Sequence, residues 1–305
     1  WDTEKGAPLK LFGWPDQEEE KTKYAVEIPK LSSLILTHDP NGEVKGLKDW
    51  PKDERPPVAW VFWSFRINSQ ILPLKTHPEI GYHIEDLPFH DQIIQTFKDC
   101  GRFCQKHDIR TTFHPDQFIL LSSPSSEVVQ RSIADLIYQA EVAQWVNADV
   151  INNHGGGAYG DKRTSLRRLR KQIEQLPEAV RSLLTFENDD RVYTPNDLLP
   201  VCRDMDIPLV YDVHHHRCLS DGSSVEATTE LAVGTWSREP LFHLSSPKYG
   251  WNSGKPGNHH DYIDADDFPA CWTNLDITVE VEAKAKELAV LKLKQDLIDR
   301  AKRIN

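Results

Sequence analysis

The stretch Val150-Ile151-Asn152-Asn153-His154-Gly155-Gly156-Gly157 decides the fold class. Its first residues are typical of a buried strand, and the histidine followed by three glycines marks where that strand ends. The same arrangement, an apolar run that leads to His, Asp or Glu and then to a polar loop, recurs in segments that end near His114, Glu187, Asp212, His243 and Glu282. The recurrence is typical of a parallel sheet whose strands all end at one edge.

Amphipathic stretches alternate with these strands, at residues 91–107, 127–146, 165–175 and 195–205. The last begins with a hydroxyl cap, Thr194, before a first-turn proline. The expected strands are 9–14, 58–67, 109–114, 149–154, 183–187, 209–213, 241–244 and 277–282. Eight strands that alternate with helices predict an α/β protein, a (β/α)8 TIM barrel forming a single domain over residues 1–305. A doubly wound open sheet is the alternative.

Two regions fit this alternation poorly. Residues 9–57 should supply the first βα unit, but after the short strand they are polar and only weakly periodic, so this unit is divergent. Residues 245–267 form a long loop containing Gly, Pro, Asn and Asp. Long loops in compact domains are usually functional, and a surface insertion is the alternative.

The charge balance argues against a protein that coats nucleic acid. Lys and Arg number 36 against 47 Asp and Glu, which gives a net charge of −11. This balance does not exclude an enzyme that meets DNA at one local site. Residues 162–171 are a local exception, because six of these ten are basic and they follow His154 on the same expected rim. They predict either a phosphate contact or a solvated helix face.

The sequence predicts a cytoplasmic protein without a membrane partner. Its longest aliphatic-aromatic run, residues 58–63, is far shorter than the roughly 20 residues of a membrane helix. Five cysteines without a Cys-x-x-Cys pair are typical of a reducing compartment.

The strand-end residues predict a metal centre, because the carboxyl ends of parallel barrel strands meet at one face. Imidazoles and carboxylates without thiolates suit divalent ions other than structural zinc, and seven candidates indicate two or three ions. Such sites suit displacement at phosphorus. Each histidine alone could be structural, and spacing does not decide between His214 and His215. The candidates are His114, His154, Glu187, Asp212, His215, His243 and Glu282.

Seven strings occur in an order that resembles the ultraviolet damage endonuclease family, from about residue 58 to residue 293. A weaker similarity precedes them at Leu11-Phe12-Gly13-Trp14. The strings are Phe65-Arg66-Ile67-Asn68-Ser69, Thr76-His77-Pro78, His114-Pro115-Asp116-Gln117-Phe118, His154-Gly155-Gly156-Gly157-Ala158-Tyr159-Gly160, Glu187-Asn188-Asp189-Asp190, Asp212-Val213-His214-His215-His216 and Val281-Glu282-Ala283-Lys284.

The resemblance implies a barrel related to endonuclease IV and xylose isomerase. It implies up to three divalent ions, typically manganese, with zinc, magnesium or cobalt as alternatives. It also implies cleavage of DNA immediately 5′ to ultraviolet photoproducts and some abasic sites, leaving a 3′-hydroxyl and a 5′-phosphate. The resemblance selects His215 from the three histidines and adds His259. The implied metal ligands are His114, His154, Glu187, Asp212, His215, His243, His259 and Glu282.

By the same resemblance, His77 lies near the scissile phosphate and is catalytic together with Glu187 and His243. Gln117 and Phe118 match a pair that enters the duplex at the lesion. A planar ring can fill the stack that flipped nucleotides leave, and damaged bases cost less to unstack. Lesion recognition also involves Trp14 and Asn68.

The sequence departs from the family pattern in three places. Phe118 stands where members commonly have Tyr, which removes any hydroxyl contact. Leu241 stands where some members have Lys, so no lysine role carries over. Trp14 replaces a Tyr, and the family's Asn-Arg-Thr segment is not evident, so damage probing by residues 9–57 is in question.

Together these observations predict a DNA repair endonuclease that acts as a monomer on damaged double-stranded DNA. A metal-dependent sugar isomerase on the same barrel is one alternative, and aldose turnover would reveal it. A non-catalytic damage binder is the other, which would shift damaged DNA in a gel without cleaving it.

Overall fold

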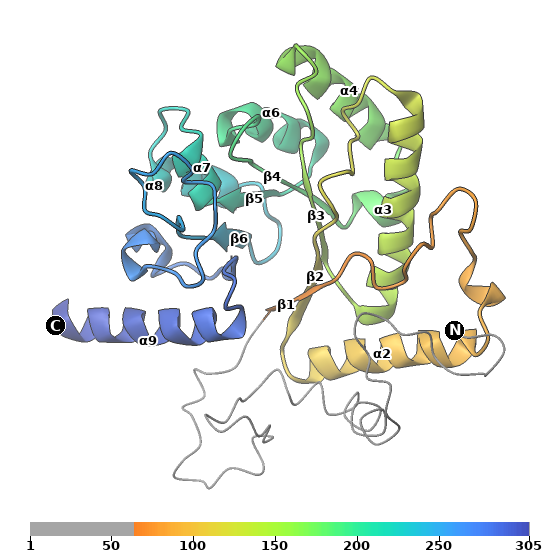
Figure 1. The fold of residues 1–305 in the computed structure, drawn as a ribbon, viewed down its shortest axis with the longest axis horizontal. Coiled ribbons are helices and arrows are strands. Elements are labelled where there is room, and N and C mark those ends of the chain that lie inside the picture. Colours follow the sequence, from red (N-terminus) through yellow and green to blue (C-terminus); the bar gives the residue numbers. More distant parts are fainter. Residues whose placement is uncertain (1–63, 305) are drawn as a thin grey trace, which may run out of the picture. The chain divides into compact units, whose positions relative to one another are not determined.

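The computed structural model describes residues 64–304. Its seven strands form one parallel sheet, and neighbours along the sheet are also neighbours along the chain (Figure 1). They are β1 (Ser64–Ile67), β2 (Arg110–Phe113), β3 (Val150–His154), β4 (Leu184–Glu187), β5 (Leu209–Asp212), β6 (Leu241–Leu244) and β7 (Thr278–Val281). Each lies inside a predicted range. The expected strand at 9–14 lies outside the described residues.

The sheet curls so strongly that its first and last strands meet. Arg66 on β1 lies 2.6 Å from Glu280 on β7, and Thr112 on β2 donates a hydrogen bond to the same carboxylate. In a flat sheet, six strand spacings of about 4.8 Å would hold β1 and β7 roughly 29 Å apart. The curled parallel sheet with its helices is the TIM-barrel fold that the alternating pattern predicts.

Helices follow the strands and cover the outside of the sheet (Figure 1). The predicted helices correspond to α2 (His90–Lys106), α3 (Ser126–Val146), α4 (Lys162–Gln175) and α6 (Pro195–Met205). At α6, Thr194 and Asp197 form a reciprocal capping box around Pro195. The sequence did not indicate α5 (Glu178–Arg181), α7 (Val213–Cys218), α8 (Val225–Val233) and α9 (Glu287–Ile304). Among residues 64–304, no helix has the length and apolarity that crossing a membrane requires.

Strand alternation separates the helix-facing core from the barrel interior. Ile151 and Phe186 belong to the large core packed under the helices and are fully buried. Val150, Val210 and Leu241 form a separate apolar cluster, which we call the barrel floor. Two residues further along each of these strands, the same face carries a polar side chain, because side chains alternate in a strand. The barrel floor therefore lies below the predicted metal ligands.

Candidate metal centre

Glu187 is the centre of the predicted ligand set. It ends β4, and its side chain is fully buried. Its carboxylate lies 3.0 Å from His114 Nε2, 3.1 Å from His243 Nδ1 and 3.3 Å from His215 Nδ1. Asn152 donates a hydrogen bond of 2.5 Å to the same carboxylate. Three histidines from three different strand ends thus converge on one buried acid.

A helix cap resolves the run of three histidines. The strand ends at Asp212, and the chain turns at once into α7, where Asp212 Oδ1 accepts the backbone N–H of His215 at 2.7 Å. His215 Nδ1 also lies 3.5 Å from Asp212 Oδ2. The helical spacing therefore brings His215, rather than His214, to the acid. His214 is buried instead against the rings of Trp251 and His259.

His243 and Glu282 complete the close-packed ligands. His243 Nδ1 lies 3.4 Å from Glu282 Oε1 and is fully buried. Potential ligand atoms come within 4.8 Å of one another in three groups, which share members and so form one cluster. The groups are His114 with Glu187 and His243, Glu187 with Asp212 and His215, and Asp212 with His243 and Glu282.

His154 and His259 lie at the margin of this cluster. The His154 ring is 5.2 Å from the ring of His114 and 6.1 Å from that of His215. The Nδ1 atom of His259 is 3.8 Å from Glu282 Oε2. All eight predicted ligands are therefore brought to one place, although these two lie outside the three tight groups.

The cluster contains buried polar atoms that lack a hydrogen-bond partner among the described residues, although three of them lie within ion-pair distance of a neighbour. Among the predicted ligands these are four atoms, His154 Nδ1, Glu187 Oε1, Asp212 Oδ2 and His243 Nδ1, and both ring nitrogens of the adjacent His214 also lack one. A buried acceptor without a partner costs roughly 1–3 kcal/mol. All four belong to predicted ligands, and each has a lone pair that a cation can take. This donor set fits divalent metal ions.

Electrostatics favour the charged forms of Glu187 and His215 despite burial, whereas burial lowers the pKa of His154 and favours its neutral form. Burial opposes ionisation of Glu187, but the neighbouring His243 and His154 hold the pKa of its carboxyl well below the usual range. Burial likewise opposes protonation of His215, but Asp212 and Glu187 raise its pKa well above the usual value. Since ligation requires neutral imidazoles, metal binding should release protons.

Two further residues, which the strand-end pattern did not select, support the cluster. Arg66 Nη1 lies 2.7 Å from Glu282 Oε1, and its Nε donates to Glu280 Oε2 at 2.7 Å. The Arg66 guanidinium also lies 3.1 Å from His243 Nε2. Glu280 precedes Glu282 by two residues, so alternation could have placed both on one face. Arg66 stands in a quoted motif, but no local signal linked it to β7.

A series of hydrogen bonds that runs through His216 fixes the position of α7. His216 Nδ1 is 2.7 Å from the hydroxyl of Tyr211, and His216 Nε2 is 3.1 Å from Asp221 Oδ1. The Asp221 carboxylate also accepts the backbone N–H groups of Ser223 and Asn196. Burial raises the pKa of Asp221, but these three hydrogen bonds together lower it to about 2.

Asp221→Asn is expected to destabilise the protein by roughly 1–3 kcal/mol at pH 7, because it removes a charged hydrogen-bond acceptor from His216. Because the folded-state pKa lies below the ordinary value, this stabilisation is present above about pH 4 and is lost as the pH falls toward about 2. Urea unfolding between pH 7 and pH 3 measures the difference. Asp266→Asn, at an exposed position, is the control. A difference that grows toward pH 3 would contradict the assignment.

The predicted catalytic histidine His77 lies apart from the tight ligand groups, on the loop after β1. Its ring is exposed, and Nδ1 accepts the backbone N–H groups of Glu79 and Ile80 at 3.2 and 3.3 Å. Because Nδ1 is an acceptor, a neutral ring carries its proton on Nε2. His77 can therefore present an N–H donor to solvent.

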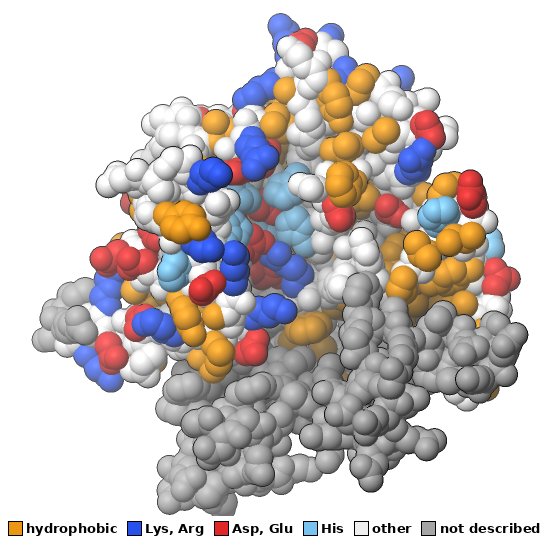
Figure 2. Space-filling model, in the orientation of Figure 1, with side chains coloured by type: hydrophobic (Ala, Val, Ile, Leu, Met, Phe, Trp, Pro, Cys, Tyr) orange, Lys and Arg blue, Asp and Glu red, His pale blue; other side chains and the backbone are white. Residues whose placement is uncertain are grey.

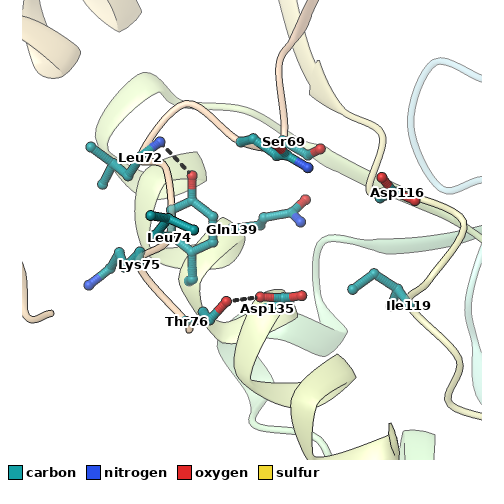
Figure 3. Close-up of a pocket in the computed structure, with 11 residues that line it drawn as sticks. Ser69, Leu72, Leu74, Lys75, Thr76, Asp116, Ile119, Asp135 and Gln139 are labelled. Carbon is teal, nitrogen blue, oxygen red and sulfur yellow. Dashed lines mark hydrogen bonds between the residues drawn. The ribbon is translucent and has the colours of Figure 1, made fainter. Parts of the chain in front are cut away.

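The predicted lesion-recognition residues lie on two loops. Asn68 and Gln117 are exposed, and Phe118 is 69% exposed, so Phe118 is not a core residue. Trp14 lies outside the described residues. A cavity of about 190 Å³ is lined by Ser69 and Asp116, the neighbours of Asn68 and Gln117 in the chain (Figure 3). The two loops therefore line one cavity, whose walls are both polar and apolar.

The basic segment forms most of α4, and several of its charges already have partners. Lys162 pairs with Asp197, and Arg170 pairs with Asp204. Arg168 donates to the carbonyl oxygen of Ser122. Figure 2 shows His and acidic side chains inside a hollow, with Lys and Arg side chains on the surface around it. Lys and Arg side chains therefore lie along part of the rim of a centre that is rich in His and acidic side chains.

Comparisons with known proteins agree with this geometry. The model of the family described as UV-endonuclease UvdE matches residues 58–305. A model of cytochrome bd terminal oxidase subunit I matches residues 1–74, which is less than half of the chain. The UV DNA damage endonuclease of Bacillus velezensis is 36% identical over 76% of this chain and 74% of that protein. The UV DNA damage endonuclease of Bacillus mycoides is 32% identical over 100% of this chain and 94% of that protein.

Solved structures also match this chain. The crystal structure of SacUVDE matches with a TM-score of 0.71 and 29% identity, over 78% of this chain and 81% of that chain. Endonuclease IV from Thermus thermophilus matches with a TM-score of 0.56 and 14% identity, over 78% of this chain and 100% of that chain. The second likeness concerns the fold alone.

Proposed function

Because this chain belongs to the UV-endonuclease UvdE family and is therefore a DNA repair endonuclease for ultraviolet damage, we propose its specific reaction. It hydrolyses the phosphodiester immediately 5′ to cyclobutane pyrimidine dimers, 6-4 photoproducts and some abasic sites. The products carry a 3′-hydroxyl and a 5′-phosphate.

One observation carries the proposal: His154, Glu187, Asp212 and His243, which gather at the ends of their strands, each have a buried ligand atom without a hydrogen-bond partner among the described residues. Up to three divalent ions, manganese in the first place, are held there. When bound, they lower the pKa of a water and stabilise charge on the leaving oxygen. The proposed ligands are His114, His154, Glu187, Asp212, His215, His243, His259 and Glu282.

The chain's own groups orient these ligands and the DNA. Glu187 bridges three histidines, and Asn152 fixes its carboxylate by a hydrogen bond. His77 donates its Nε2–H to an oxygen of the scissile phosphate, where negative charge grows during attack.

Damage is recognised by residues that follow β2, on the side of the barrel mouth that lies across from β6. Phe118 fills the gap in the base stack and Gln117 contacts the bases beside it, with Asn68 and Trp14 contributing. The exposure of Phe118 supports this role, since a ring held away from the core is available to DNA. The enzyme acts as a monomer in the cytoplasm.

Nicking of ultraviolet-irradiated supercoiled plasmid in the presence of manganese tests the proposal. We expect damage-dependent conversion to the open circle that EDTA abolishes. On an end-labelled duplex with a single dimer, the cut should fall at the 5′ side and leave an end that a polymerase extends. Equal nicking of unirradiated plasmid, or no nicking with any divalent ion, would refute it.

A further inference from the structure

The tip of the long loop after β6 exposes an aromatic side chain beside a cation. Tyr249 is 65% exposed, and the Nζ atom of Lys248 lies 5.3 Å from the centre of its ring. An exposed ring beside a cation offers a flat apolar face and a positive charge at the same place on the surface. Neither residue has a role in the metal centre or in the proposed lesion contact.

Backbone hydrogen bonds hold this tip. The N–H of Lys248 donates to the carbonyl oxygen of Asn258 at 2.6 Å, and that of Gly250 donates to Pro247 at 3.1 Å. Gly250 has a φ of 79°, which glycine adopts without strain. Pro247 pairs with His259 in an antiparallel bridge. The isolated bridge that precedes the turn carrying Tyr249 therefore also includes a proposed metal ligand, His259.

The base of the loop is fixed by one acid. Asp267 accepts hydrogen bonds from the Ser246 hydroxyl and from Trp251 Nε1. The Arg217 guanidinium lies 3.7 Å from the same carboxylate and packs on the Trp251 ring. Tyr249 lies between Ser246 and Trp251 in the chain, so both sides of the tip are anchored.

The tip and Phe118 lie on different sides of the barrel mouth. Phe118 follows β2 and Tyr249 follows β6, and these strands are four positions apart in the curled sheet. In the described sheet, whose first and last strands meet, β2 and β6 are separated by four positions in one direction and three in the other, so they lie nearly opposite each other. Two exposed rings thus flank the cluster around Glu187.

We propose that Tyr249 and Lys248 form a second DNA contact, in which the Tyr249 ring stacks on a nucleobase and Lys248 binds a neighbouring phosphate. Aromatic rings next to cations suit nucleic acid, because bases present flat faces and the backbone presents charge. The inference rests on the proposed function, because it requires DNA over the barrel mouth. It places the DNA across the whole mouth, from Phe118 to Tyr249.

Single-turnover nicking of a dimer-containing duplex tests the contact, with manganese present and the enzyme concentration varied. Tyr249→Ala should raise the half-saturating enzyme concentration roughly five- to a hundredfold and leave the maximal rate within about twofold. Tyr249→Phe should keep wild-type values, since it retains the ring. Leu231→Ala removes an exposed apolar side chain from α8 and is the matched control.

Salt dependence gives an independent measurement. Lys248→Gln should reduce the slope of log affinity against log salt by about one, the value for a lost phosphate contact. An unchanged half-saturating enzyme concentration for Tyr249→Ala would overturn the inference. If the maximal rate fell while that concentration stayed the same, Tyr249 would act by holding His259 in place rather than by binding DNA. These outcomes require a wild-type enzyme that nicks, so they differ from a failure of the proposed function.

Discussion

Glu187→Gln is expected to lower damage-dependent nicking by at least about a hundredfold. Mutation of a residue that only hydrogen-bonds to a metal ligand already lowers metal affinity or activity by roughly 10–100-fold, and Glu187 is a proposed ligand itself. Glu187 contacts His114, His215 and His243 at 3.0 to 3.3 Å, and one of its oxygens is buried without a hydrogen-bond partner among the described residues. The amide keeps the shape of the side chain but replaces one ligand oxygen by an N–H₂ donor. Metal content after dialysis should fall together with activity.

The matched control is Glu178→Gln, which makes the same chemical change in an exposed surface ion pair on α5. It should retain the metal content and nicking rate of the wild type. If Glu187→Gln kept its metal and lost only activity, Glu187 would act on the DNA rather than on the ions. Full activity in Glu187→Gln would remove it from the site.

Arg66→Met is expected to destabilise the metal-free protein by about 3 kcal/mol, because it leaves the Glu280 and Glu282 carboxylates without their cation. Arg66 contacts these carboxylates at 2.6 and 2.7 Å. For a domain of this size the change corresponds to roughly 6–12 °C in Tm. Manganese should restore part of the loss, since bound cations would neutralise the Glu282 carboxylate instead.

Thermal unfolding with EDTA and with manganese measures both effects. Arg131→Met, which breaks an exposed pair with Glu127 on α3, controls for loss of a surface arginine and should change Tm little. A loss in Arg66→Met no larger than in Arg131→Met would show that the guanidinium does not stabilise the acids. An equal loss with and without manganese would show that Arg66 acts through packing alone.

Sequence patterns predicted the elements whose signals are local. The bounds of β6 and α6 match the predicted ranges, because an apolar run and a capping box are each encoded within a few residues. The strand ends then gave His114, Glu187 and His243, since all parallel strands end at one face.

Other parts of the site depend on contacts that no local pattern encodes. The choice of His215 over His214 required the helical turn that Asp212 caps, because strand spacing alone left both histidines open. The position of His259 depends on an irregular loop paired at Pro247. Arg66 reaches Glu280 across 214 positions in the sequence, and only the curl of the sheet brings them together.

The barrel floor has a consequence for the order of events. Val150, Val210 and Leu241 form an apolar cluster below the ligands, which favours approach of ions and DNA from the mouth. DNA lying across the mouth would then stand in the path of the ions. Loading of metal should precede binding of the duplex, and a chelator should act slowly until the nicked strand has left. Bound DNA would therefore slow the exchange of the metal ions that lie beneath it.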